Sequence, residues 1–255
     1  MPEHSEIRVL TLQVKSLISN KKVHNVTALD SKYQDIVTQF QSYLGREIVS
    51  VYQHGKKMYW DLGAVTATFG FGMTGSFTKE KTKHSRVEFE FKDTTKLYFT
   101  DIRKFGSVKL EKMPILCGID PAGSKFTVEA LKKLFQANSK QRIGEYLLDQ
   151  NGLAGIGNYL RAEILYRAKV RPWVLCDSLT DQDIENIHRC TQEILQESYQ
   201  AGGATIATYR SLKGIGSFSD SFKVYKKSKD PFGNPVVREL DKTKRAMWWC
   251  PAVQK

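Results

Sequence analysis

The second and third residues of the chain could together perform covalent chemistry. Methionine is readily removed before a small residue, and removal of Met1 would leave Pro2 with a free secondary amine. Such an α-amino group titrates near ~7.7–8 and can attack a sugar aldehyde carbon to form an iminium. Glu3 is placed to donate or accept protons at the sugar. The alternatives are that the pair only leads into a helix, or that Met1 stays and Pro2 is an unreactive amide.

A glycine-rich stretch over residues 152–163, GLAGIGNYLRAE, could bind an anion. Its glycine spacing differs from that of a dinucleotide-binding loop, and the residues before it have a helical pattern. We expect a helix, a tight glycine turn and a second helix with Asn158 as its N-cap. The unpaired N–H groups at the start of that second helix would suit a DNA phosphate. The glycines could equally serve only to let two helices turn sharply.

The elements that must position these groups follow from the spacing of apolar residues. Apolar residues recur at three- and four-residue steps over residues 7–17, which predicts a helix with Ser5 as its N-cap and Glu6 in its first turn. From about residue 47 the period changes to two. Runs at 47–53, 57–62, 65–69, 86–91 and 96–100 predict an antiparallel sandwich or barrel.

The rest of the chain has a different pattern. Proline and glycine mark a linker, and the following residues are helical to about residue 200, with a capping-box start at Thr180–Asp183. In the basic tail, a Pro231–Pro235 turn separates strand-like runs at Lys223–Lys226 and Met247–Trp249. We therefore expect an α+β chain. Its parts are a β domain at 1–118, a linker at 119–125, a helical domain at 126–222 and a hairpin at 223–255.

Composition limits the compartment and the partner. The 255 residues include 39 Lys+Arg and 27 Asp+Glu, and this net charge of +12 favours a polyanionic partner. No stretch approaches the ~18 apolar residues of a membrane span. The four cysteines form no CxxC pair, which indicates a reducing compartment and argues against a disulfide framework and a zinc site. We expect an intracellular protein that faces nucleic acid and needs no membrane.

Six blocks, in order along the chain, resemble the Fpg/Nei DNA glycosylases. They are PEHSEI, GKKMYW, FGMTGSF, TDIRKFG, LLDQNGLAGIGNYLRAEILYRAKVRPW and KRAMWWCP. The long block resembles the helix-two-turn-helix of that family, and several blocks are most similar to the endonuclease VIII-like branch that lacks a metal in its finger. The resemblance implies an N-terminal antiparallel β-sandwich domain, a helical helix-two-turn-helix domain and a zincless-finger β-hairpin.

The resemblance also implies which residues would be catalytic. Pro2 would be the Schiff-base nucleophile, Glu3 the acid and base, and Glu6 a supporting carboxylate in the same pocket. Lys56, in a Gly55-Lys56 turn, matches the family lysine that holds a phosphate beside the lesion. A solvated surface charge is the alternative interpretation of Lys56.

Further residues would hold the DNA. Asn158 and Arg245 match an asparagine and a hairpin arginine that bind phosphate in the family. Met73, Arg103 and Phe105 match side chains that fill the gap left in the duplex when a nucleotide is extruded. Without the resemblance, Met73 would be interpreted as core, Phe105 as a sheet residue and Arg103 as a solvated charge.

Two departures from the family pattern concern the N-terminus and the finger. Ser5 replaces the second proline of the usual Pro-Glu-x-Pro-Glu, and we expect activity to survive that change. Zinc-bearing members need two CxxC pairs, of which only Cys250 remains, and one thiolate cannot build a tetrahedral zinc site. We therefore expect no metal and no other cofactor. The hairpin would be held by packing of Val236, Met247, Trp248 and Trp249.

The function implied by the resemblance is that of a bifunctional DNA glycosylase and AP lyase in base excision repair. It would excise oxidised pyrimidines and hydantoins from damaged double-stranded DNA as a monomer, and single-stranded DNA stays open as a substrate. The loop at about 202–222 would contact the base, but its sequence contains no decisive pocket residue. The alternatives are a non-catalytic DNA-binding protein of the same fold, or an RNA-binding protein with no active site.

Overall fold

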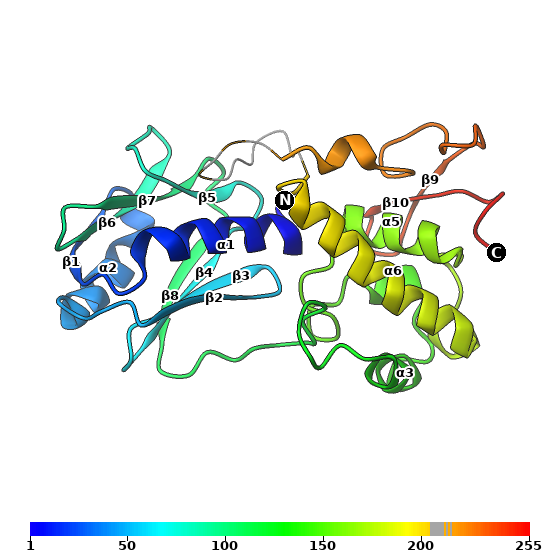
Figure 1. The fold of residues 1–255 in the computed structure, drawn as a ribbon, viewed down its shortest axis with the longest axis horizontal. Helices are drawn as coiled ribbons and strands as arrows, with labels where there is room; N and C mark the ends of the chain where they lie inside the picture. Colours follow the sequence, from blue (N-terminus) through cyan, green and yellow to red (C-terminus); the bar gives the residue numbers. More distant parts are fainter. Residues whose placement is uncertain (205–211, 213, 215) are drawn as a thin grey trace. The chain divides into compact units, whose positions relative to one another are not determined.

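The computed structural model describes residues 1–204, 212, 214 and 216–255, which divide into two compact units. Unit 1 comprises residues 1–116 and the described part of 201–217, and unit 2 comprises residues 117–200 and 218–255 (Figure 1). We had expected residues 201–217 in the helical domain. They group with unit 1 because Ala204 N–H donates to the Glu6 carboxylate and Leu212 N–H donates to Gln13 Oε1.

Unit 1 is a sandwich of two antiparallel sheets, which confirms the predicted fold class. The sheets have the strand orders β1-β6-β7-β5 and β2-β3-β4-β8. The strands are β1 Val23–Ala28, β2 Ser50–His54, β3 Lys57–Asp61, β4 Thr66–Gly70, β5 Gly75–Thr78, β6 Ser85–Phe91, β7 Lys96–Asp101 and β8 Ser107–Glu111. The 3-10 helices η1 Ser31–Tyr33 and η2 Gln41–Tyr43 flank helix α2 Gln34–Phe40.

The core between the sheets is aromatic, because alternate residues of each strand point inward. Trp60 of β3 is fully buried, and its ring centroid lies 4.5 Å from that of Phe69 and 4.9 Å from that of Phe89 in the opposite sheet. Such packing leaves little freedom for the strands. The loops at the strand ends are therefore carried on a rigid frame.

Helix α1, His4–Ile18, packs against β2, β3 and β5 of unit 1 (Figure 1, dark blue). Its periodic apolar residues are buried, as the spacing predicted. The predicted N-cap is wrong: Glu3, not Ser5, caps the helix. Glu3 and Glu6 form a reciprocal capping box, so each side chain accepts the other's backbone N–H and the helix starts two residues earlier than expected.

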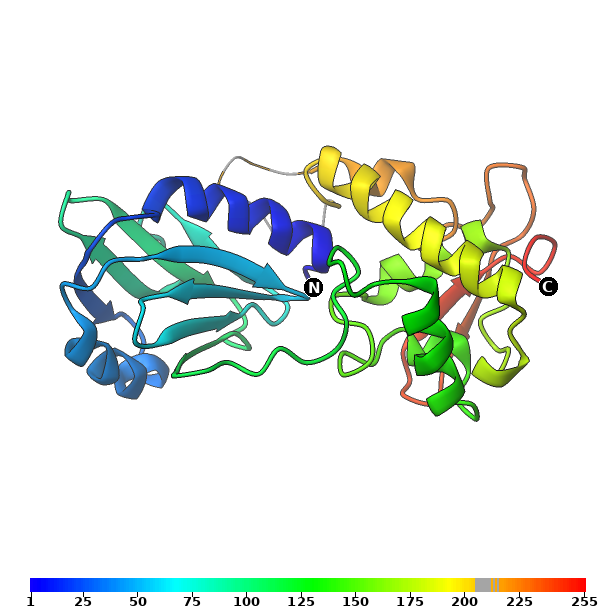
Figure 2. The ribbon, with the colours of Figure 1, turned by 60° about the horizontal axis from the view of Figure 1, so that its bottom comes forward.

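Unit 2 is built around the buried helix α5, which packs against α6 and β10 (Figure 2, light green and yellow for the two helices). Its helices are α3 Val128–Ala137, α4 Ile143–Tyr146, α5 Asn158–Ala168 and α6 Asp181–Gln200, with the 3-10 helices η3 Cys176–Ser178 and η4 Phe218–Ser221. The helix–turn–helix expected around the glycines is confirmed by α4 and α5. However, Gly157 is the N-cap of α5, because its carbonyl already accepts the Arg161 N–H.

The hairpin of unit 2 pairs β9, Val237–Leu240, with β10, Ala246–Trp249. A predicted strand at Lys223–Lys226 is wrong, because the buried Glu163 carboxylate takes the N–H groups of residues 223–225 that a strand partner would need. The predicted turn at Pro231–Pro235 is present, with the Gly233 N–H donating to Asp230 O, but the turn that joins β9 to β10 is 241–245. Across the described ranges, no helix combines the length and the apolar content of a membrane span.

Candidate active site

The head of α1 holds three of the expected catalytic residues in unit 1. Pro2, Glu3 and Glu6 are buried, whereas Met1 is exposed. Glu6 Oε2 accepts the Glu3 N–H at 2.7 Å, and Glu6 Oε1 accepts the Ala204 N–H at 2.7 Å. Glu6 therefore fixes the backbone beside Pro2. Residues 205–211, 213 and 215 of the loop expected to contact the base lie outside the described residues.

Gly203 provides the space that Glu6 needs. Its φ of +87° favours glycine, and a Cβ at this position would lie 2.9 Å from Glu6 Oε1. The backbone at position 203 can therefore lie this close to the Glu6 side chain because the residue is a glycine. This contact joins residues far apart in the sequence.

Lys56 lies in the two-residue turn between β2 and β3, as the sequence predicted. Gly55 has a φ of +57°, which suits a tight hairpin turn. The Gln53 side-chain amide donates to His4 O at 2.8 Å and to Gly55 O at 2.6 Å. Gln53 thus ties the Lys56 turn to the head of α1. Sequence reasoning missed Gln53 because no spacing relates it to His4.

Met73, Arg103 and Phe105 come together from two loops of unit 1. Met73 lies between β4 and β5, and the other two lie between β7 and β8. Arg103 Nη1 is 3.1 Å from Met73 Sδ, and the guanidinium lies 4.9 Å from the Phe105 ring centroid. Met73 is 39% exposed and Phe105 59%, so neither is a core residue. Apolar groups around a guanidinium can contact unstacked bases.

Asn158 and Arg245 lie in two parts of unit 2 that contact each other, the start of α5 and the turn before β10. Arg245 ends the β9–β10 turn, and Asn158 begins α5. Asn158 Nδ2 donates to Ala246 O at 2.9 Å, and Arg161 Nη2 donates to the same carbonyl at 3.2 Å. The start of α5 therefore holds the backbone next to Arg245.

A buried ion pair supports the same turn. Arg161 Nη1 is 2.8 Å from Asp241 Oδ2, and these side chains are 0% and 1% exposed. Asp241 Oδ1 accepts the N–H groups of Thr243 and Arg245, each at 2.9 Å. Burial alone would raise the pKa of Asp241, but hydrogen bonds from Thr243 and Arg161 outweigh it and lower the pKa. The aspartate therefore stays ionised and fixes the Arg245 backbone.

The finger residues do not fit a zinc ion. Cys250 is buried, which raises the pKa of its thiol, and its Sγ lies 3.6 Å from Asp230 Oδ2. The Asp230 carboxylate already accepts bonds from Phe232, Asn234 and Tyr166. No cluster of three metal-ligating side chains occurs in the part of the chain that the structure describes. The absence of a metal stays a prediction.

Comparisons with known proteins cover nearly the whole chain. Family models of the formamidopyrimidine-DNA glycosylase N-terminal, H2TH and C-terminal domains match residues 1–108, 117–210 and 218–255. A formamidopyrimidine-DNA glycosylase of Listeria innocua is 31% identical over 276 residues, and one of Bacillus cereus is 31% identical over 278 residues. Each alignment covers all of this chain and at least 99% of the relative.

Solved structures agree with these matches. The MutM (Fpg) protein of Thermus thermophilus has a TM-score of 0.87 and 27% identity, with 99% of this chain and 98% of that chain covered. The Lactococcus lactis Fpg in complex with DNA that contains an abasic site has a TM-score of 0.87 at 22% identity, with 99% of each chain covered, and shares the fold. The chain therefore belongs to the formamidopyrimidine-DNA glycosylase family, the Fpg/Nei family that its motifs resemble.

Proposed function

We propose that the protein is a bifunctional DNA glycosylase and AP lyase that excises oxidised bases from damaged double-stranded DNA. Its family acts in base excision repair of such bases. The observation that carries the proposal is the buried Pro2-Glu3 pair at the head of α1, whose backbone the Glu6 carboxylate fixes. A fixed nucleophile beside a carboxyl group is the arrangement that covalent catalysis requires.

The reaction starts once Met1 has been removed. The Pro2 amine attacks C1′, and the electrons of the glycosidic bond leave with the base, which takes a proton from water. Glu3 takes the proton that the amine loses and delivers it to the ring oxygen, so the sugar ring opens and a C1′ iminium forms. Loss of a C2′ proton then expels the 3′ phosphate, and a further elimination expels the 5′ phosphate. Water hydrolyses the iminium and regenerates Pro2.

The DNA contacts follow from charge and shape. Lys56, Asn158 and Arg245 bind phosphates, which makes binding depend on salt. Met73, Arg103 and Phe105 fill the space of the extruded nucleotide, at a cost of a few kcal/mol for unstacking. We propose oxidised pyrimidines and hydantoins as the preferred lesions. The relatives are named for formamidopyrimidines, so a substrate panel must contain both classes.

Borohydride trapping tests the covalent step. Duplexes with an abasic site, thymine glycol, a hydantoin, 8-oxoguanine or a formamidopyrimidine are incubated with the parent protein and with the P2G and E3Q variants. The expected result is a covalent adduct with the parent protein, lost or sharply reduced with P2G and strongly reduced with E3Q. Intact mass must first show that Met1 is absent, because an acylated Pro2 cannot react.

The exposed residues Pro251 and Glu80 provide matched controls, as P251G and E80Q. Both control variants should give the parental yield of adduct. Trapping on the abasic duplex alone would support the lyase activity and contradict the proposed base excision. Binding of all duplexes without any adduct would instead favour a non-catalytic DNA-binding protein.

A further inference from the structure

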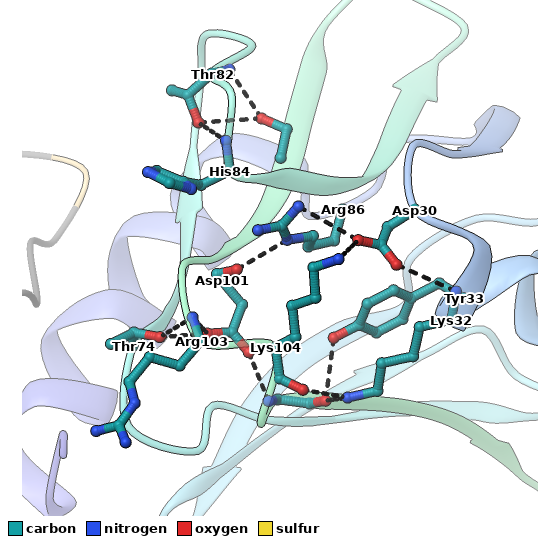
Figure 3. Close-up of polar contacts among 12 residues, drawn as sticks. Asp30, Lys32, Tyr33, Thr74, Thr82, His84, Arg86, Asp101, Arg103 and Lys104 are labelled. Atoms are coloured by element: carbon teal, nitrogen blue, oxygen red, sulfur yellow. Dashed lines mark hydrogen bonds and ion pairs between the residues drawn. The ribbon is translucent and has the colours of Figure 1, made fainter.

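A buried carboxylate lies at the junction of the two loops that carry Met73, Arg103 and Phe105. Asp101 ends β7 and is fully buried. Its Oδ2 accepts the Gly106 N–H at 2.6 Å, and its Oδ1 accepts the Arg103 N–H at 3.2 Å and the Thr74 hydroxyl (Figure 3). One side chain thus holds both ends of the segment 103–106 and the residue after Met73.

The two loops also contact each other directly. A Cβ at Gly72 would lie 2.9 Å from both the carbonyl carbon and the Cβ of Phe105. The Thr74 hydroxyl accepts the Arg103 N–H at 3.0 Å, next to its own bond to Asp101. The positions of Met73 and Phe105 are therefore coupled through packing and through one carboxylate.

Basic residues hold the segment 103–106 from the side of η1. Lys104 has a φ of +59°, a strained conformation for a residue with a side chain. Lys32 Nζ donates to Lys104 O at 2.6 Å and to Gly106 O at 2.8 Å, and Lys104 Nζ pairs with Asp30 at 2.8 Å (Figure 3). These contacts help to offset the strain of the backbone at Lys104.

We propose that Asp101 is a positioning residue for damage recognition, which orders Met73, Arg103 and Phe105 before DNA binds. The inference rests on the proposed function, in which these three side chains fill the gap that the extruded nucleotide leaves in the duplex. Side chains on an ordered loop lose less conformational entropy on binding than side chains on a mobile one. Replacing Asp101 should therefore weaken binding only to DNA that these three side chains contact.

Equilibrium binding to three DNA probes tests this positioning role. The probes are a duplex with a tetrahydrofuran abasic analogue, the same duplex undamaged, and the tetrahydrofuran single strand, which has no orphaned base. For D101N we expect about tenfold weaker binding to the tetrahydrofuran duplex, equivalent to the loss of one charge-assisted hydrogen bond. Affinity for the other two probes should stay within about twofold, because phosphate contacts dominate there.

D61N is the matched control. Asp61 also ends a strand of unit 1 and accepts the N–H of a nearby residue, Gly63, at 2.7 Å, but its turn carries none of the three side chains. T74V should reproduce part of the D101N effect, and T74S, which keeps the hydroxyl, should restore parental binding.

Two outcomes would overturn the role of Asp101. One is an equal loss of affinity for all three probes. The other is that D101N prefers the tetrahydrofuran duplex over the other two probes as strongly as the parent protein does. Because tetrahydrofuran cannot form the iminium, this result is independent of catalysis. Failure of the parent protein to trap on an abasic duplex would contradict the proposed function, whatever the D101N result.

Discussion

Two loops proposed to contact DNA, one in each unit, are built in the same way. Each begins with a buried aspartate that accepts the N–H of the residue two positions later. Asp101 also accepts the Gly106 N–H, and Asp241 also accepts the Arg245 N–H. Each loop contains a lysine with a positive φ, Lys104 at 59° and Lys244 at 61°. Two unrelated frameworks thus order a basic loop by the same local device.

The two aspartates differ in how their charge is balanced. Asp241 pairs with Arg161 inside unit 2, whereas the Asp101 carboxylate accepts hydrogen bonds from two backbone N–H groups and a hydroxyl. The nearby cations of unit 1, Arg86 and Lys104, pair with Asp30 instead. A buried ion pair is costly to break on one side, because it leaves an uncompensated charge. We therefore expect the stability of unit 2 to depend more strongly on Asp241 than the stability of unit 1 depends on Asp101.

The largest effect should come from R161M, which leaves Asp241 buried without its cation. We expect a loss of about 3–5 kcal/mol in the free energy of unfolding. The double variant R161M/D241N should recover part of this loss. Urea unfolding, followed by tryptophan fluorescence, measures both. R189M is the control, because Arg189 is 58% exposed in its pair with Glu193 and should cost at most about 1 kcal/mol.

The next effect concerns the close approach of the two loops in unit 1. G72A places a side chain at a φ of +53° and against the Phe105 backbone, so we expect a cost of about 2–4 kcal/mol. G63A has a similar φ of +81° but no atom near its Cβ, so it should cost about 1–2 kcal/mol. Equal losses for G72A and G63A would mean that packing between the two loops does not contribute to stability.

A smaller effect should appear on acidification. The folded-state pKa of Asp241 is lowered, so its carboxylate stabilises the protein above the ordinary aspartate pKa of ~3.9. This contribution is lost as the pH falls through the lowered pKa. The difference in stability between the parent and D241N should therefore be largest near neutral pH and shrink below about pH 4. A difference that stays constant down to the acid transition would contradict this linkage.

The smallest effect should come from C250S. The serine hydroxyl can still donate to Asp230, so the unfolding free energy should change by about 1 kcal/mol or less. A metal chelator should leave the melting temperature of the parent unchanged. A large drop with the chelator would show that the finger holds a metal after all.

The sequence predicted the features that local patterns determine. Strict alternation at 86–91 predicted a strand because one face of a sheet is buried. The helix caps were misplaced at Ser5 and Asn158, because a cap depends on which carbonyl accepts the first helical bond, and several nearby polar residues could serve. The anchoring roles of Asp101 and Gln53 could not be found, because each also binds a residue in another segment of the chain, Thr74 for Asp101 and His4 for Gln53.

The contact between Glu6 and Ala204 has a consequence for the order in which the protein is made. The two residues are 198 positions apart in the sequence, although both belong to unit 1. At about 5–20 residues per second, the ribosome reaches Ala204 about 10–40 s after Glu6. During that time the Glu6 carboxylate lacks its hydrogen bond from the Ala204 N–H. The head of α1 is thus completed late in translation, when most of unit 2 has already been synthesised.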